Sequence, residues 1–195
     1  MCMILLGGFV LASSPVIKKI LESVAKIPKT NIGAYFFCFF VSSMACWLNW
    51  GMGLIVGAFF CLELGKRNKT IHFPLLVTIS YMGFIFWHGG MSGSIPLVVS
   101  SSESFSYKWI QKVIPLQETI FSKLNISIIF FLLLFLGLLI AFIARKVKDS
   151  VVPLSGDLVK EVAEYQPEKR VDGSLILLVL LIALFLVVSL MKNRL

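Results

Sequence analysis

The stretch SSMACWLNWGMGLIVGAFF, residues 42–60, decides the fold, because a short polar tip interrupts a long apolar run there. The run extends from Asn31 to Leu64, and lysine or arginine residues flank it on both sides. Basic residues mark the cytoplasmic side of a membrane protein, so the chain should enter and leave from that side. Each arm of the run is shorter than the roughly 20 residues that a full helical span requires.

Two interpretations of this run remain open. Residues 31–65 form either a pair of short transmembrane helices or a re-entrant helical hairpin whose tip is buried in protein. The tip carries Asn49, Gly51 and Gly53, and a polar residue with glycines suits a place where irregular backbone lines a cavity. The pattern therefore favours the hairpin, although a tight turn between two spans would also use the glycines.

A second apolar run, residues 71–99, is interrupted by HGGMSGS at residues 88–94. So many glycines and serines do not hold a helix together in a membrane. The pattern predicts a broken helix, the element from which transporters build binding sites near the bilayer midplane. Glycine pairs at four-residue spacing (Gly53 with Gly57, Gly89 with Gly93) could instead be close-packing faces between helices. That alternative leaves His88, Ser92 and Ser94 without a role.

The composition indicates an integral membrane protein. Of the 195 residues, 58% are hydrophobic and 14% are charged, far from the balance of a soluble domain. The formal net charge of +8 comes from lysines and arginines beside apolar runs, which argues against nucleic-acid binding. The four cysteines lie inside apolar runs without a Cys-x-x-Cys pair, and neither histidine has a ligand at metal-binding spacing. We therefore expect no metal and no cofactor.

These features predict an all-α polytopic membrane protein with three regions. Residues 1–148 form the membrane module: a partial helix over 1–12, an amphipathic interfacial helix over 15–29, the hairpin, the broken helix, a polar outward loop, and a transmembrane helix over 125–144. Residues 149–173 form a cytoplasmic connector, and residues 174–195 form a last transmembrane helix. Lysines line one face of the helix over 15–29, which suits the cytoplasmic interface.

At both interruptions the sequence resembles the short-chain fatty acid transporter family, bacterial carriers of acetoacetate and butyrate. Four stretches carry the resemblance in the same order: WLNWGMGLIVGA (47–58), HFPLL (72–76), WHGGMSGSIPL (87–97) and IPLQETIFS (114–122). The last 50 residues match only in general character. The resemblance implies a multi-pass protein of the bacterial cytoplasmic (inner) membrane with the fold of the ion-transporter superfamily.

That fold has two inverted repeats, each with a re-entrant hairpin and a broken helix whose tips meet at the substrate. The hairpin and broken helix predicted here would supply one repeat, about half of the transporter. We therefore expect either a complementary second half or a homo-oligomer as partner, besides the lipid bilayer. The alternative is a membrane fragment that does not transport, or a scaffold or assembly subunit.

The predicted function is ion-coupled uptake of a small carboxylate such as butyrate or acetoacetate, with Na+ or H+ as the coupling ion. Backbone amides at half-helix N-termini carry partial positive charge and would meet the carboxylate. His88 is ionisable within an apolar run, so it is a functional candidate, or else it caps the broken helix. An enzyme is not expected, since no nucleophile or carboxylate pair accompanies His88. The predicted site residues are Asn49, Trp50, Gly51, Gly53, His88, Gly89, Gly90, Ser92, Gly93 and Ser94.

Overall fold

The computed structural model describes residues 14–164, and the regular secondary structure of this part of the chain is helical, without a β-strand. The chain divides into two units, Met1–Leu154 and Ser155–Leu195. The helices predicted for residues 1–12 and 174–195 lie outside the described residues, as does the end of the connector.

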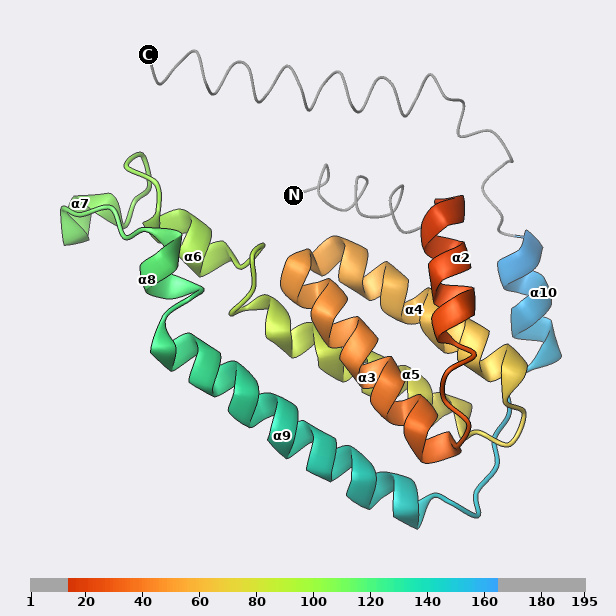
Figure 1. The fold of residues 1–195 in the computed structure, drawn as a ribbon. Helices are drawn as coiled ribbons and strands as arrows, with labels where there is room; N and C mark the ends of the chain where they lie inside the picture. Colours follow the sequence, from red (N-terminus) through yellow and green to blue (C-terminus); the bar gives the residue numbers. More distant parts are fainter. Residues whose placement is uncertain (1–13, 165–195) are drawn as a thin grey trace. The chain divides into compact units, whose positions relative to one another are not determined.

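The first unit holds nine helical elements in its described part (Figure 1). They are α2 (Pro15–Val24), α3 (Asn31–Leu48), α4 (Trp50–Arg67), α5 (Phe73–Met82), the 3₁₀ helix η1 (Gly83–Trp87), α6 (Ser94–Val99), α7 (Tyr107–Ile110), α8 (Leu116–Thr119) and α9 (Lys123–Lys146). In the second unit, α10 (Gly156–Glu164) is described.

Helices α3 and α4 pack against each other and are joined by Asn49 alone. Asn49 ends α3 and caps α4, where its side-chain oxygen accepts a hydrogen bond from the Met52 amide at 3.1 Å. Just past the tip, a Cβ atom on Gly53 would overlap the backbone of Cys46. Glycine at this position therefore lets the two arms approach closely beside the tip.

Helix α5 and η1 pack on the same helix pair, and small residues make the crossing tight. Ser42 of α3 and Ser80 of α5 share a hydrogen bond of 2.9 Å, and a Cβ on Gly57 of α4 would lie 2.5 Å from the Ser80 hydroxyl oxygen. Small residues allow the backbones of two helices to approach each other closely, and serine hydroxyls then form hydrogen bonds between the helices. Larger apolar side chains fill the core around this crossing: Phe39, Phe60, Leu64, Leu76, Ile79 and Phe86.

The change from α5 to the 3₁₀ helix η1 aligns a row of aromatic rings. A 3₁₀ helix has about 3 residues per turn, so side chains three apart eclipse one another. Phe84 accordingly stacks on Trp87 with ring centroids 5.3 Å apart, and Tyr81 stacks on Phe84 at 5.8 Å. The row leads from the C-terminal end of α5 to the start of the break in the predicted broken helix.

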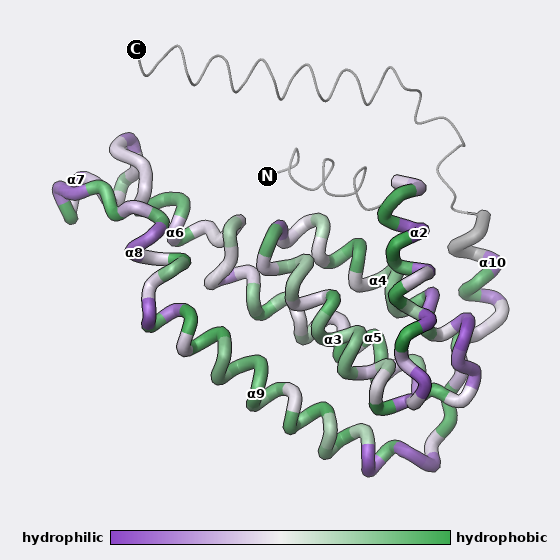
Figure 2. The backbone as a smooth tube through the Cα atoms, in the orientation of Figure 1, coloured by the Kyte–Doolittle hydropathy of each residue, from purple (hydrophilic) through white to green (hydrophobic). Residues whose placement is uncertain are grey.

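Helix α9 has 24 residues and packs on α3 through Gly137, Ile140 and Ala144, while most of its other apolar side chains are exposed. Among the described helices, α3 and α9 are long and apolar enough to cross a bilayer. Hydrophobic residues colour most of α9, and hydrophilic ones gather at its C-terminal end (Figure 2). Exposed leucine and phenylalanine side chains along one helix are what a lipid-facing surface requires.

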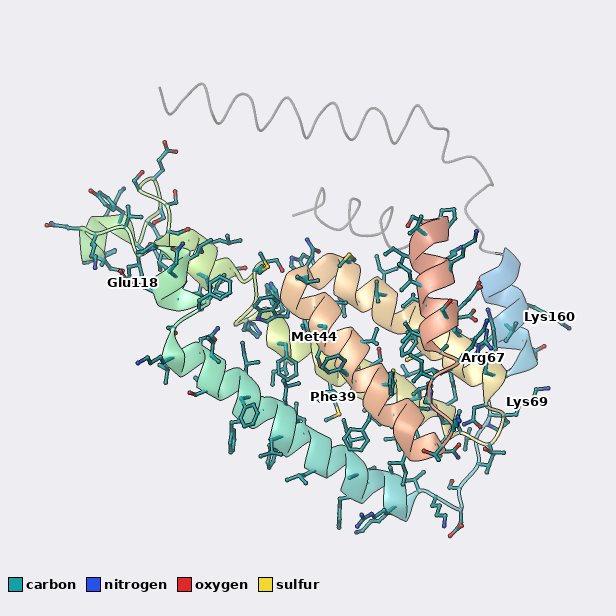
Figure 3. The ribbon with its side chains drawn as sticks, in the orientation of Figure 1. Phe39, Met44, Arg67, Lys69, Glu118 and Lys160 are labelled. Atoms are coloured by element: carbon teal, nitrogen blue, oxygen red, sulfur yellow. The ribbon has the colours of Figure 1, made fainter. Side chains whose placement is uncertain are left out.

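Basic residues lie at the end of the α3–α4 pair that is remote from the tip. Arg67 ends α4 and Lys69 follows in the next loop (Figure 3). The amphipathic helix α2 packs on α4 through its buried Leu21, and its Lys18 ammonium lies 5.7 Å from the centre of the Phe59 ring.

Candidate functional site

The tip of the α3–α4 pair and the break after η1 bind each other directly. We call this region the tip–break junction: residues 47–50 on the tip side and residues 87–93 on the break side. The Met91 amide donates to the Trp47 carbonyl oxygen at 2.8 Å. The Trp50 amide donates to the Ser92 hydroxyl oxygen at 3.0 Å. These two hydrogen bonds bring together two stretches that are more than 40 residues apart in the sequence.

The glycines of the break are needed for this close contact. They are not needed for an unusual backbone conformation. No glycine in the described residues has a positive φ angle. A Cβ on Gly90 would instead overlap the carbonyl oxygen of Trp47, and one on Gly93 would lie 2.8 Å from the carbonyl oxygen of His88. Gly90 is therefore needed for backbone-to-backbone packing against the tip.

Tryptophan rings line the junction. The Trp50 and Trp87 ring centroids are 5.8 Å apart, and the Trp87 indole nitrogen donates to the Ser92 carbonyl oxygen at 2.8 Å. Trp47 contacts Phe121 edge to face at 6.4 Å. Rigid aromatic side chains of this kind offer a large apolar contact area for a ligand with a short hydrocarbon tail.

His88 lies at the edge of the junction. Its side chain is exposed, and its ring lies 4.5 Å from the Trp87 ring in a tilted arrangement. Among the described residues its imidazole makes no hydrogen bond. The side chain is thus placed beside the break with both ring nitrogens available to a ligand.

The first turn of α4 retains one amide donor. Trp50 donates to Ser92, Met52 donates to the Asn49 side chain, and Gly53 donates to the Asn49 carbonyl. The buried Gly51 amide has no acceptor among the described residues. Since the N-terminus of a helix carries partial positive charge, this amide suits an anionic oxygen.

Two predicted site residues lie apart from these contacts. Ser94 begins α6, where its side chain is exposed and makes no hydrogen bond within the described residues. Gly53 faces Cys46 on the other arm of the pair instead of the break. The remaining predicted residues, which lie in the junction or directly beside it, are Asn49, Trp50, Gly51, His88, Gly89, Gly90, Ser92 and Gly93.

Asn125, at the start of α9, is a residue of this region that the sequence patterns did not identify. Its side-chain nitrogen donates to the Gly89 carbonyl oxygen at 2.9 Å and to the Ile120 carbonyl oxygen at 2.7 Å. Asn125 thus fastens the break to α9. The signal that could have found it is a polar amide near the start of a long apolar run.

A separate cavity of about 250 Å³ lies between α4 and α5. Its lining is mostly apolar and includes Leu54, Ala58 and Cys61 of α4 with Val77, Ser80 and Tyr81 of α5. Ala58 is eight residues from Trp50, which corresponds to about 12 Å along the helix. Leu54, which also lines the cavity, is four residues from Trp50, so the cavity extends to within about one helical turn of the junction.

Comparison with known proteins decides the family. The model of a family described as "Short chain fatty acid transporter" matches residues 1–191. The chain belongs to the short-chain fatty acid transporter family. No solved structure matches it.

Two relatives in this short-chain fatty acid transporter family are both named "Putative short-chain fatty acid transporter". The Escherichia coli (strain K12) protein is 34% identical over 192 residues, which cover 94% of this chain and 43% of the relative. The Haemophilus influenzae (strain ATCC 51907 / DSM 11121 / KW20 / Rd) protein is 39% identical over 134 residues, 66% of this chain and 30% of the relative. The chain thus spans less than half the length of these relatives.

Membership of this transporter family confirms the resemblance seen in the sequence. Together with the apolar helices α3 and α9, it makes the chain a membrane protein of a transport family and not a member of an enzyme family.

Proposed function

We propose that the chain forms part of a carrier that takes up short-chain fatty acids such as butyrate or acetoacetate, with the carboxylate bound at the tip–break junction. The observation that carries this proposal is the hydrogen bond from the Trp50 amide to the Ser92 hydroxyl. It places a hydroxyl group from the break against the N-terminus of α4. Membrane transporters use half-helix N-termini to meet anionic substrate groups, and the Ser92 hydroxyl adds a hydrogen-bond donor at this one.

The carboxylate would accept hydrogen bonds from two groups. One is the Gly51 amide, which has no acceptor among the described residues. The other is the Ser92 hydroxyl, whose oxygen already accepts from Trp50 and whose proton is therefore available to a substrate oxygen. The short hydrocarbon tail would lie against the Trp50 and Trp87 rings.

The charge balance of the junction supports ion coupling. Within the described residues, the tip and the break contain no lysine, arginine or carboxylate. An unpaired carboxylate is costly to bury, so uptake would need a positive charge that arrives with it. A proton on the exposed His88 would supply that charge, and a Na+ ion coordinated by Asn49 is the second possibility.

The wider architecture of the carrier is part of this proposal. The tip and the break would form one of two inverted repeats in a multi-pass protein of the bacterial inner membrane. The other side of the substrate would be enclosed by a complementary half or by a second copy of the chain. The position of the basic residues Arg67 and Lys69, remote from the tip, supports a cytoplasmic location for that end.

Radiolabelled butyrate uptake in membrane vesicles tests the proposal, with the chain assayed beside a complementary half taken from the Escherichia coli relative. Ser92→Ala should raise the apparent KM about tenfold or more, because it removes a hydrogen bond to a charged group. Ser94→Ala is the matched control, since the Ser94 side chain is exposed and lies outside the junction. Equal KM values for the two variants would place the carboxylate elsewhere.

A further inference from the structure

Two cysteines from opposite arms of the hairpin meet in its interior. The sulfur atoms of Cys38 on α3 and Cys61 on α4 are 3.4 Å apart, and both side chains are almost fully buried. Both thiols also point toward the Leu76 carbonyl oxygen of α5, at 3.8 Å and 3.5 Å. Three helices therefore hold the two sulfurs against each other.

An apolar cavity gives access to one member of the pair. Cys61 lines the cavity between α4 and α5, whereas Cys38 lies behind it. Ala58, Val77 and Tyr81 form the exposed rim of this cavity, and the lining is mostly apolar. A small lipid-soluble molecule can therefore approach Cys61, while a charged reagent is excluded by the cost of its desolvation.

We infer that Cys38 and Cys61 form an oxidisable dithiol, which a lipid-soluble two-electron oxidant converts into a disulfide between the arms of the hairpin. The sulfurs would need to approach by about 1.4 Å to reach the bond length of a disulfide. Cys38 is eleven residues before Asn49, and Cys61 is twelve after it. The new bond would thus close the hairpin about 16 Å from its tip.

The reaction balances with an azodicarboxamide such as diamide as oxidant. The Cys61 sulfur bonds to one nitrogen of the N=N group, and the Cys61 thiol proton passes to the other nitrogen. The Cys38 sulfur then displaces the substituted hydrazine from Cys61, forming the S–S bond, and its proton goes to the departing nitrogen. The two thiols lose two electrons and two protons, and diamide becomes the hydrazine.

Cys46 supplies an internal comparison. It is equally buried, but it lies near the tip beside Gly53 and has no thiol partner among the described residues. It should therefore remain reduced under conditions that oxidise the pair. Oxidation of the pair does not depend on transport, so it can be tested without transport activity and independently of the proposed function.

The experiment counts maleimide-reactive cysteines by intact mass after denaturation of the full chain from membrane vesicles. The chain has four cysteines, so a Cys2→Ser background leaves three. Diamide should lower the count from three to one, and dithiothreitol should restore it. In that background, Cys46→Ser should still lose two reactive thiols. Cys38→Ser should lose at most one, as a Cys61–diamide adduct that the intact mass reveals, and Cys61→Ser should lose none.

Two results would overturn the inference: a count that stays at three after diamide, or an equal loss of thiols in Cys38→Ser. Cys61→Ala serves as a second variant should Cys61→Ser fail to insert. Hexacyanoferrate(III), a charged oxidant, should leave the count at three in sealed vesicles. A loss of two thiols with this reagent would contradict the apolar route through the cavity.

Discussion

The backbone amide of Met91 lies 2.8 Å from the carbonyl oxygen of Trp47 and donates a hydrogen bond to it. This bond joins the break to the tip through main-chain atoms, so no side-chain substitution can remove it directly. The bond depends instead on Gly90, the residue before Met91. A Cβ atom at Gly90 would overlap the Trp47 carbonyl oxygen and prevent this close approach.

Gly90→Ala should therefore separate the tip from the break. The added methyl group overlaps the Trp47 carbonyl oxygen, and overpacking of this kind costs about 1–3 kcal/mol. We expect a lower melting temperature in detergent and a loss of butyrate uptake, with membrane insertion retained. Gly137→Ala is the control, because its Cβ would meet only the Phe36 ring at 3.4 Å. Equal melting temperatures for both variants would refute the packing role of Gly90.

Asn49→Asp separates the structural role of Asn49 from a role in anion binding. A carboxylate keeps the oxygen that accepts from the Met52 amide and favours a helix N-terminus, so stability should be preserved. Its negative charge should repel a carboxylate substrate and lower uptake at least tenfold. Asn49→Ala should instead destabilise the protein by about 1 kcal/mol. Normal uptake by Asn49→Asp would show that the substrate does not bind near the tip.

Asn125→Ala should loosen the attachment of the break to α9. It leaves the carbonyl oxygens of Gly89 and Ile120 without their donor, at a cost of about 1–3 kcal/mol in stability. Thermal unfolding in detergent measures the change. Ser127→Ala is the comparison, since the Ser127 hydroxyl bonds only to the Lys123 carbonyl on an exposed face of α9. A larger effect from Ser127→Ala would be inconsistent with this role of Asn125.

His88→Ala tests the coupling proposed above. If His88 carries the proton that accompanies the carboxylate, its removal should flatten the dependence of uptake on external pH. Uptake measured over a range of pH in vesicles, with and without Na+, distinguishes the two coupling ions. An unchanged pH profile together with a strict requirement for Na+ would assign coupling to the cation.

The membrane topology can be read from single cysteines in a cysteine-free background. Cysteines at Lys69 and Lys148 should react with a membrane-impermeant maleimide from the same, cytoplasmic side, and one at Ser104 should react from the other side. A cysteine at Met52 distinguishes the two forms of the hairpin. Free labelling of Met52→Cys from outside would indicate two full spans in place of a re-entrant tip.

The sequence indicated the interruptions at Asn49–Gly53 and His88–Ser94, because polar and glycine residues stand out within apolar runs. The family resemblance implied that the two interruptions meet at the substrate, but neither it nor the patterns indicated that they hydrogen-bond to each other, since a bond such as Trp50 to Ser92 depends on how three helices cross. The role of Gly90 could not be predicted from the sequence either. A missing Cβ in a sequence does not say whether a ligand or the protein's own backbone occupies the space.

Asn125 shows a different limit of sequence reasoning. In the sequence it begins a glycosylation-type triplet next to a membrane segment. This triplet says nothing about which residues Asn125 contacts in the fold. Its two hydrogen bonds depend on the turn before α9, which brings the Ile120 and Gly89 carbonyl oxygens to the same amide group. The 3₁₀ helix η1 was likewise not predicted, because the run over residues 83–87 is as apolar as the α-helix before it.

Asn49 alone connects two helices of eighteen residues each, and this sets the rotational phase of one helix against the other. One residue inserted between Trp50 and Gly51 would turn the rest of α4 by about 100° about its axis. Gly53 and Gly57 would then leave the face that meets α3, and bulkier side chains would take their place. Four inserted residues would return that face to within about 40° of its original direction. Tolerance of insertions after the tip should therefore rise and fall with the helical period.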